Sequence, residues 1–388
     1  MILEKINWGE LIVIKDDLRR KLLTNSLRFG CALAFTPLLA RPVLAKDDFD
    51  DYKLEMNSGM FQIEDEFSQY KKAYAEAYRG YQNEISQFWS EVEQSNKTSW
   101  VDYSPTMDVK RVIDFANNEI RISIQGDRLQ GFSPEDSERE ILAALAMKVD
   151  DAYTLDPVLA KVIGDQQPDS QRSILNLDSS LAHNLNKSAV LERKQGKKGE
   201  MLTIIAKLPK NSLSSRAQSF LPSVEVSAAK WQVPAGLILA IMHTESAFNP
   251  MARSHVPAFG LMQIVPKSAG RDASRLVFGR ERLLNGQDLY KPETNIEMGT
   301  AYLHILDSKY LKGIVDDKSR QLCVIAAYNT GAGNVARAFS GTTSVKKALP
   351  IINRLSSKQV YAHLRSNLKY EEARNYIKKV TQTLPLYS

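Results

Sequence analysis

One acidic residue stands at the end of an almost entirely apolar stretch. Residues 235–242 are apolar nearly all round, which is typical of a buried helix, and Glu245 follows them. Glu245 lies four residues after Ile241 and seven after Ile238, so its carboxyl group shares their face. Burial disfavours the charged form of a carboxyl group and raises its pKa, as a general acid near neutral pH requires. We therefore predict that Glu245 is a catalytic acid; an ion-paired core glutamate and a solvent-reaching glutamate at a frayed helix end are the alternatives.

Glu245 opens a series of short motifs in the C-terminal half. In chain order they are Glu245-Ser246, Gly260-Leu261-Met262-Gln263, Ala327-Tyr328-Asn329 and Tyr376. Their order and spacing resemble the motifs of the soluble lytic transglycosylase domain, which is related in fold to goose-type lysozyme. The resemblance covers about residues 212–388 and implies a mainly helical, lysozyme-like domain that cuts the glycan strands of peptidoglycan.

The resemblance also implies a role for each motif residue. It makes Glu245 first the acid and then the base, and it places Tyr376 beside Glu245, where the hydroxyl could orient the acid. It puts the other motif side chains around the sugars: Ser246, Met262, Gln263, Tyr328 and Asn329. Structural alternatives exist, because buried tyrosines often serve as core aromatics, and Gln or Asn side chains often cap turns.

The motifs contain one acid, whereas an ordinary glycosidase uses two carboxyl groups. A lytic transglycosylase needs one, because its substrate supplies the nucleophile. The resemblance implies that Glu245 protonates the oxygen of the β-1,4 bond between N-acetylmuramic acid and N-acetylglucosamine, while the N-acetyl group stabilises the cation. Glu245 then takes the proton from the 6-hydroxyl of the same sugar, and a 1,6-anhydro ring closes without water. The enzyme is then a carbon-oxygen lyase.

Two other functions stay open at this point. A lysozyme-like peptidoglycan hydrolase would need a water-activating acid and would leave reducing ends. A non-catalytic glycan-binding module would have no need of a buried acid. Among the neighbouring ionisable groups, we expect Glu297 to form a surface salt bridge and His243 to lie at the surface or to cap a helix.

The N-terminal half predicts a smaller α+β region. Residues 59–92 predict one long amphipathic helix, whose aromatic stripe has spacings of three and four residues. The stripe consists of Phe67, Tyr70, Tyr74, Tyr78 and Tyr81. Apolar and polar residues alternate in 109–115 and 120–124, which predicts a β-hairpin that turns at 116–119.

Further elements are predicted between this hairpin and the catalytic motifs. Ser133 and Pro134, followed by acidic residues, mark the start of a helix that should run to about Val149. Residues 166–200 are polar and predict an exposed connection, which precedes a last strand over 201–208.

The chain of 388 residues exceeds what one compact core usually covers. We predict an α+β protein with a signal peptide over 1–45, an N-terminal α+β domain with linker over 46–211 and a catalytic domain over 212–388. Residues 212–388 carry a net charge of +11 and residues 46–211 a net charge of −8. The basic half suits a polyanionic ligand, and the acidic half could pack against it and position it or restrict its groove.

The first 45 residues have the order of a secretory signal. The basic cluster Arg19-Arg20-Lys21 precedes an apolar run over 29–40, and Val43-Leu44-Ala45 offers a cleavage site. The run is about half the roughly 20 residues that a membrane-spanning helix needs. Arg19-Arg20 also fits a twin-arginine export signal. Cys31 makes a poor lipidation site because the apolar run follows it. We expect a periplasmic protein with at most peripheral association with the outer membrane.

Cysteine content and export limit which cofactors and partners the protein can have. Without residues 1–45, Cys323 is the only cysteine, so no intramolecular disulfide can form. Its apolar neighbours predict a buried thiol. No paired Cys and His spacing indicates a metal site, and we expect no cofactor. Secretion argues against nucleic acid, so we expect a monomer that binds peptidoglycan.

Overall fold

An antiparallel sheet forms the centre of the N-terminal half. The computed structural model describes residues 47–163, 170–254 and 258–387, so the predicted signal peptide lies outside the described residues. Within them, five strands pair antiparallel in the order β1-β2-β3-β5-β4. The strands are β1 (Ser99–Tyr103), β2 (Val109–Asp114), β3 (Glu119–Gln125), β4 (Val190–Gly196) and β5 (Gly199–Lys207).

The predicted hairpin is confirmed by the pairing of β2 with β3. Asp114 lies opposite Glu119, and its Oδ1 atom accepts a hydrogen bond of 2.8 Å from the backbone N–H of Asn117. Asn118 has a φ of 55°, a left-handed conformation that asparagine tolerates better than most residues. Turn chemistry and alternation therefore agree on the same register.

The two outer strands were not predicted. The expected last strand is present as β5, but the polar stretch over 166–200 also contains β4, so its reading as a connection alone is wrong. β4 is exposed along most of its length because it forms the sheet edge, where charged side chains are common. Its polar composition therefore hides its strand character. β1, at the opposite edge, was missed because its residues do not alternate between apolar and polar.

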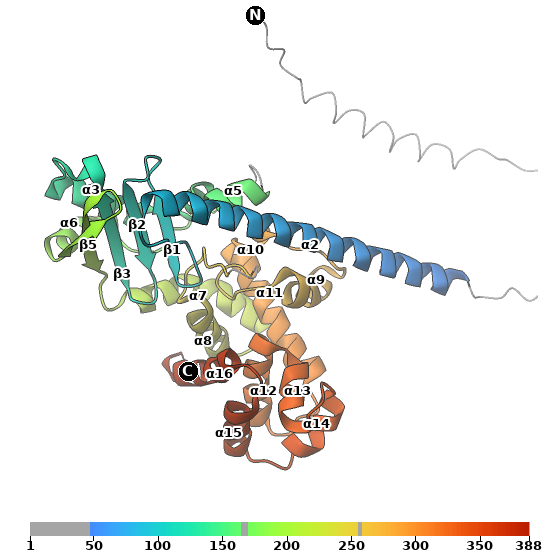
Figure 1. Ribbon diagram of the computed structural model, residues 1–388. Helices are drawn as coiled ribbons and strands as arrows, with labels where there is room; N and C mark the ends of the chain where they lie inside the picture. Colours follow the sequence, from blue (N-terminus) through green and yellow to red (C-terminus); the bar gives the residue numbers. More distant parts are fainter. Residues whose placement is uncertain (1–46, 164–169, 255–257, 388) are drawn as a thin grey trace, which may run out of the picture. The chain divides into compact units, whose positions relative to one another are not determined.

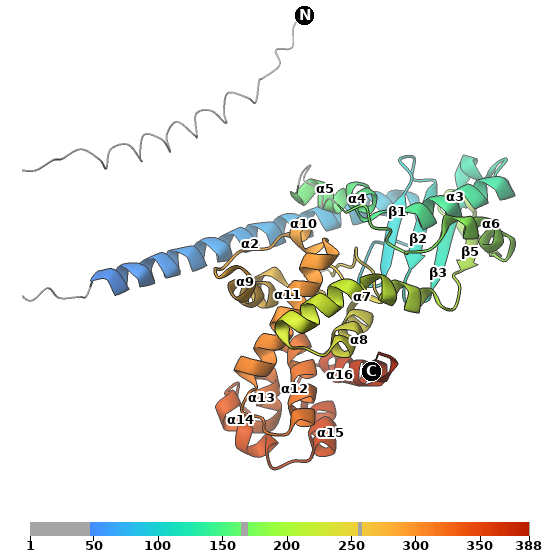
Figure 2. The same ribbon diagram turned by 180° about the vertical axis from the view of Figure 1, so that it is seen from behind.

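Helices cover both faces of the sheet. In Figure 1, α2 (Asp47–Phe88) crosses one face, and in Figure 2, α3 (Pro134–Ala146) and α6 (Ala182–Lys187) lie over the other. The predicted long amphipathic helix is confirmed as α2, although α2 begins and ends earlier than expected. Tyr74 and Tyr81 of the aromatic stripe are buried, as a core face requires.

The predicted start of α3 is confirmed by its capping box. Ser133 accepts a hydrogen bond from the Asp136 N–H at 3.2 Å, and the Asp136 carboxylate accepts one from the Ser133 N–H at 3.0 Å. The helix ends at Ala146, before the predicted end at Val149. Short elements complete this half: η1 (Gly126–Leu129), α4 (Val149–Thr154), α5 (Pro157–Ile163) and η2 (Ser179–Leu181).

The secondary structure of the C-terminal half is mainly helical in its described residues. Its longer helices are α7 (Ser212–Trp231), α8 (Ala235–Ser246), α11 (Pro292–Ile305), α12 (Asp317–Thr330), α15 (Ser357–Asn367) and α16 (Glu371–Thr383). Its shorter elements are η3 (Pro266–Gly270), α9 (Arg271–Phe278), α10 (Gly286–Leu289), η4 (Leu306–Tyr310), α13 (Ala332–Ser340), α14 (Val345–Ile352) and η5 (Leu384–Leu386). Together with the sheet, these helices confirm the α+β class.

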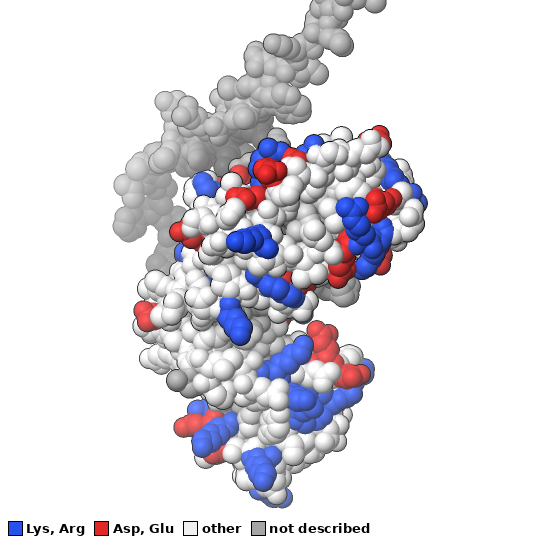
Figure 3. Space-filling model, turned by 90° about the vertical axis from the view of Figure 1, so that its left-hand side faces the viewer, with Lys and Arg blue, Asp and Glu red and all other residues white. Residues whose placement is uncertain are grey.

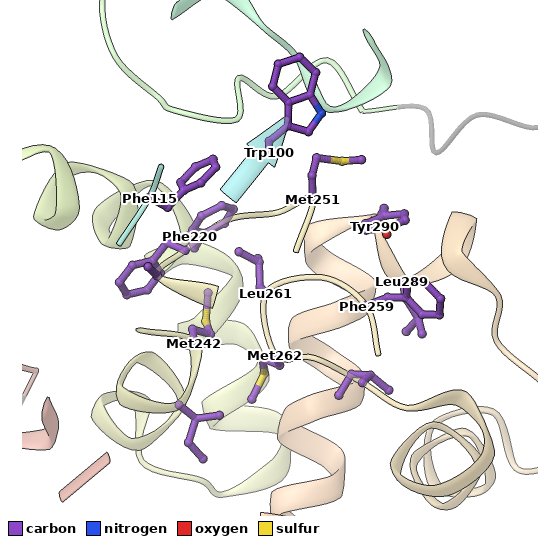
Figure 4. Packing of buried hydrophobic residues seen from close by; sticks show 14 of the residues in the cluster. Trp100, Phe115, Phe220, Met242, Met251, Phe259, Leu261, Met262, Leu289 and Tyr290 are labelled. Carbon is purple, nitrogen blue, oxygen red and sulfur yellow. The ribbon is translucent and has the colours of Figure 1, made fainter. Parts of the chain in front are cut away.

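One hydrophobic core runs from the sheet to α8. Figure 4 shows Trp100 and Phe115 of the sheet region near Phe220 of α7 and Met242 of α8. From residue 57 onward, the described residues form one compact unit. Among the described residues, no helix has the length and apolar character that crossing a bilayer demands.

Basic side chains are concentrated near the C-terminus. On the face drawn in Figure 3, Lys and Arg gather over the lower part, where α14 and α15 lie. Among the basic residues of this part of the chain, Lys346 and Lys347 of α14, Arg354 after it and Lys358 of α15 are exposed. The positive charge predicted for this half is therefore presented to solvent.

Candidate active site

Helix α8 carries Glu245 into a groove. The helix is buried from Leu237 to Met242 because it packs between α7 and α16, and Glu245 follows in its last turn. Only 5% of Glu245 is exposed, yet it lines a groove of about 830 Å³. The structure therefore places the carboxyl group in an apolar wall that opens to a substrate-sized space, as the sequence predicted.

The end of α8 is fixed by the residues that follow Glu245. Ala247 and Phe248 have φ values of 51° and 63°, so the chain leaves the helix in a left-handed conformation. The Ser246 hydroxyl donates to the carbonyl oxygens of Met242 at 3.0 Å and Leu261 at 2.8 Å. Ser246 is fully buried and does not line the groove. Its side chain joins the end of α8 to the loop that contains the second motif.

That loop has room for glycine alone at Gly260. A Cβ atom there would lie 2.3 Å from Asn295 Nδ2 and 2.4 Å from the Leu289 carbonyl oxygen, and its φ is 73°. Asn295 is buried, and its side chain holds the loop: Nδ2 donates to the carbonyl oxygens of Phe259 and Leu289, and Oδ1 accepts from the Met262 N–H, each at 2.8 Å. The loop is thereby fixed against α10 and α11.

The loop and α12 place three predicted residues on the groove. Gln263, Tyr328 and Asn329 line it, and the Tyr328 hydroxyl donates to the Met262 carbonyl oxygen at 2.8 Å. Gln263 Nε2 donates to the Gly260 carbonyl oxygen at 3.1 Å, while its buried Oε1 has no hydrogen-bond partner among the described residues. The Met262 side chain is fully buried and packs on Gly299, so it lies behind the groove wall.

Burial sets the proton affinity of Glu245. Desolvation raises the pKa of Glu245 to about 7, while Lys97 and Tyr376 act in the opposite direction and Glu372 adds to the rise. The Tyr376 hydroxyl is buried beside the carboxyl group and interacts with it, although no described atom meets full hydrogen-bond geometry with this hydroxyl. Near neutral pH both forms of Glu245 are therefore populated.

Two charged residues close to Glu245 in the groove were not predicted. Lys97 Nζ lies 3.7 Å from Glu245 Oε2 and 3.6 Å from Glu372 Oε1. Glu372 could have been found, because it precedes Tyr376 by four residues and so shares its helix face. Nothing in the sequence connects Lys97 with Glu245, since the two residues meet only through the packing of the sheet region against α8.

The other side-chain predictions have mixed outcomes. Glu297 forms the expected ion pair, with Lys230, and Cys323 is buried as expected. His243 is half-buried instead of capping a helix: its Nδ1 lies 3.1 Å from the Tyr387 hydroxyl, and its ring packs against Phe248. The described residues contain no group of three or more His, Cys, Asp or Glu side chains that could hold a metal ion.

The geometry and the comparisons with known proteins identify the class. Residues 223–351 match the family model described as the transglycosylase SLT domain. A relative from Histophilus somni strain 2336 is 32% identical over 342 residues, which cover 82% of this chain and 90% of that protein. The chain therefore belongs to the lytic transglycosylase family.

The relatives also have a more particular name. The Histophilus somni protein is a membrane-bound lytic murein transglycosylase C. A protein of the same name from Sodalis glossinidius is 44% identical over 181 residues, covering 47% of this chain and 50% of that protein. The solved 70 kDa soluble lytic transglycosylase of Escherichia coli is 21% identical, with a TM-score of 0.37 over 67% of this chain and 36% of that chain.

Proposed function

We propose that this protein cleaves the β-1,4 bond between N-acetylmuramic acid and N-acetylglucosamine in peptidoglycan and leaves a 1,6-anhydromuramic end. One observation carries the proposal: the Glu245 carboxyl group is buried, has its pKa raised to about 7 and lines a groove of about 830 Å³. Family membership supports the same substrate, because the relatives are named lytic murein transglycosylases.

Glu245 begins the reaction as an acid. Its raised pKa keeps part of the enzyme protonated near pH 7, so the carboxyl group can donate a proton to the glycosidic oxygen as the bond to C1 breaks. The N-acetyl group of the muramic acid stabilises the positive charge at C1, which removes the need for an enzymic nucleophile. The leaving sugar takes the proton as its new 4-hydroxyl.

Glu245 completes the reaction as a base. The carboxylate takes the proton of the 6-hydroxyl while O6 bonds to C1, which closes the anhydro ring and restores the protonated acid. Water is neither consumed nor produced. Tyr376 orients the carboxyl group through both steps, and Gln263, Tyr328 and Asn329 bind the sugars from the groove wall. Ser246 and Met262 contribute by holding the loop that positions Gln263.

Glu372 favours a second candidate function. Glu245 Oε2 lies 3.7 Å and Glu372 Oε1 lies 3.6 Å from Lys97 Nζ, so these two oxygens are at most about 7 Å apart, a limit that still allows the shorter separations of an inverting hydrolase. Glu372 would then activate a water molecule for attack at C1. Two observations favour the transglycosylase instead: the Glu372 side chain is 74% exposed, and Lys97 is next to it. A side chain this exposed is poorly fixed for directing one water molecule at C1.

Product analysis separates the two reactions. We expect mass spectrometry of digested sacculi to detect anhydro ends, which are lighter than reducing ends by one water molecule. We also expect Glu372→Gln to keep at least a third of the wild-type rate. Reducing ends as the main product, together with loss of activity in Glu372→Gln, would establish the hydrolase.

We also propose an export route and a domain division. Residues 1–45 direct the chain to the periplasm and are removed there, and the mature chain comprises an N-terminal domain over 46–211 and a catalytic domain over 212–388. The names of the relatives support membrane association, which we assign to peripheral contact of a monomer with the outer membrane. N-terminal sequencing of protein from the periplasmic and washed membrane fractions tests both points: a chain that begins at Met1 would contradict the removal.

A further inference from the structure

A segment of the N-terminal half is attached to the catalytic helix at its end. The segment consists of residues 89–98, between α2 and β1. Its backbone carbonyl oxygens accept three hydrogen bonds from the loop after α8. Asn249 Nδ2 donates to the Lys97 carbonyl oxygen at 3.4 Å, while the Arg253 N–H and Nε donate to the carbonyl oxygens of Asn96 and Ser95, both at 3.3 Å. The position of the Lys97 main chain is thus set by contacts with the catalytic half.

The segment is also rigid in itself. The Asn96 Oδ1 atom accepts hydrogen bonds from the backbone N–H groups of Thr98 at 2.9 Å and Ser99 at 3.1 Å. Such an Asx turn fixes the chain direction at the start of β1. Lys97, in the middle of the turn, is 39% exposed at its side chain and lines the groove. The turn therefore presents the ammonium group to the groove.

The charged and titratable groups that face Glu245 come from three elements. Lys97 belongs to the turn, Glu372 and Tyr376 belong to α16, and Tyr328 belongs to α12. Arg253 also lines the groove, but its charge is neutralised by Asp156, at 2.7 Å from Nη1. Among the described residues that line the groove, Lys97 is thus the cation within ion-pair distance of Glu245.

We propose that Lys97 is a positioning residue that stabilises the carboxylate form of Glu245 between its two proton transfers. This inference rests on the function proposed above. Glu245 must first hold a proton and then hold a negative charge while the 6-hydroxyl is brought into place. Burial favours the protonated form of Glu245, and the Lys97 ammonium group at 3.7 Å favours the carboxylate form. The ammonium group is in place before the negative charge develops, so little reorganisation is needed.

Glu372 limits this stabilisation. It shares the Lys97 ammonium group at 3.6 Å, so the charge of Lys97 is divided between two carboxylates. The negative charge of Glu372 also disfavours ionisation of Glu245 directly, in the same direction as burial. Lys97 and Glu372 together therefore keep the pKa of Glu245 between two extremes. A much lower pKa would leave the carboxyl group ionised before the reaction begins, and a much higher pKa would keep it from releasing its proton.

The pH dependence of the rate tests this role. Without Lys97 the carboxylate is less stable, so the pKa of Glu245 rises and the protonated acid persists to higher pH. We expect Lys97→Met to move the alkaline limb of the pH–rate profile up by about one pH unit and to lower the maximal rate about tenfold. Glu372→Gln removes a like charge and should move the same limb down, by about half a unit. The initial rate of muropeptide release from purified sacculi, measured between pH 5 and 9, gives both shifts.

Matched variants separate charge from structure. Lys97→Arg keeps the charge and should restore the wild-type profile within about 0.3 pH unit. Lys230→Met removes another half-exposed lysine that is paired with a glutamate, but outside the groove lining, and should leave the profile unchanged. Melting temperatures identify any variant that is unfolded. If Lys97→Met is unfolded, Glu372→Gln still decides the result through the direction of its shift: a limb that stays in place or moves up overturns the role of Lys97.

Each outcome has one meaning. An alkaline limb that stays in place in both Lys97→Met and Glu372→Gln, or that moves in the same direction in both, overturns the role of Lys97. The proposed function is tested separately by Glu245→Gln: if that variant retains lysis, the function fails whatever Lys97 does. A shifted limb in Lys97→Met with an inactive Glu245→Gln supports both.

Discussion

Two of the ion pairs between the N-terminal half and the catalytic half differ in exposure to water. In the first, Arg253 Nη1 lies 2.7 Å from Asp156 Oδ2, and the two side chains are 2% and 4% exposed. In the second, Lys97 Nζ lies 3.7 Å from Glu245 Oε2, and the side chains are 39% and 6% exposed. The first pair is dry and short, whereas the second is open to the groove and longer.

The partners of each pair explain this difference. Asp156 Oδ1 also accepts the N–H groups of Val158 at 3.0 Å and Leu159 at 3.1 Å, so the dry pair ties α5 to the loop after α8. Such a fully bonded pair holds one geometry. Lys97 instead divides its charge between Glu245 and Glu372, and substrate can reach it. The contact between the two halves therefore has two effects. The dry pair fixes the active-site loop, and the open pair adjusts the proton affinity of Glu245.

The dry pair should give the largest effect on stability. Asp156→Asn removes the charge partner of the buried Arg253, and an unpaired buried charge typically costs about 3–5 kcal/mol of the free energy of unfolding. Urea unfolding at pH 7 measures the loss. The matched control is Glu297→Gln, which breaks the half-exposed pair with Lys230 and should cost less than about 1 kcal/mol. Equal losses in the two variants would show that burial does not distinguish these pairs.

A contact within the catalytic half should give an intermediate effect. Tyr376→Phe keeps the buried ring and removes the hydroxyl beside Glu245. Catalytic hydrogen bonds that are poorly aligned without substrate tighten in the reacting complex, and a hydrogen bond to a charged group contributes about 1.5–3 kcal/mol. We therefore expect the rate of muropeptide release to fall at least about tenfold. Tyr361→Phe, on a partly buried tyrosine outside the groove lining, is the control. If the two variants have the same rate, Tyr376 acts through packing alone.

Salt should give the smallest effect and should act on the open pair only. Raising the ionic strength from about 0.05 to 0.5 M screens exposed charges much more than buried ones. The wild-type alkaline limb should then move up by a few tenths of a pH unit, toward the Lys97→Met profile. The limb of Lys97→Met should not move up, because only the repulsion between Glu372 and Glu245 remains there for salt to screen. The stability difference between wild type and Asp156→Asn should stay constant. A limb that responds equally in wild type and Lys97→Met would indicate that salt acts elsewhere.

Local patterns account for most of what the sequence predicted. The hairpin, the cap at Ser133 and the buried end of α8 depend on neighbouring residues, so alternation, capping chemistry and helical spacing were sufficient. β4 was missed because an edge strand needs few apolar residues.

The site divides in the same way. Glu245, Gln263, Tyr328 and Asn329 belong to motifs and were found, and they line one groove. Ser246 and Met262 belong to the same motifs, but they lie behind the wall because motif membership does not distinguish a side chain that faces the groove from one that supports it. Lys97 belongs to no motif, and its place depends on the packing of two regions that are distant in sequence.

The central claim is that the carboxyl group of Glu245 carries out both proton transfers. The most direct test compares lysis and binding of purified sacculi by wild type and Glu245→Gln, a substitution that keeps the shape of the side chain. We predict that lysis falls by about a thousandfold or more, while co-sedimentation with sacculi and the melting temperature are retained. Lysis at the wild-type rate by Glu245→Gln would contradict the account.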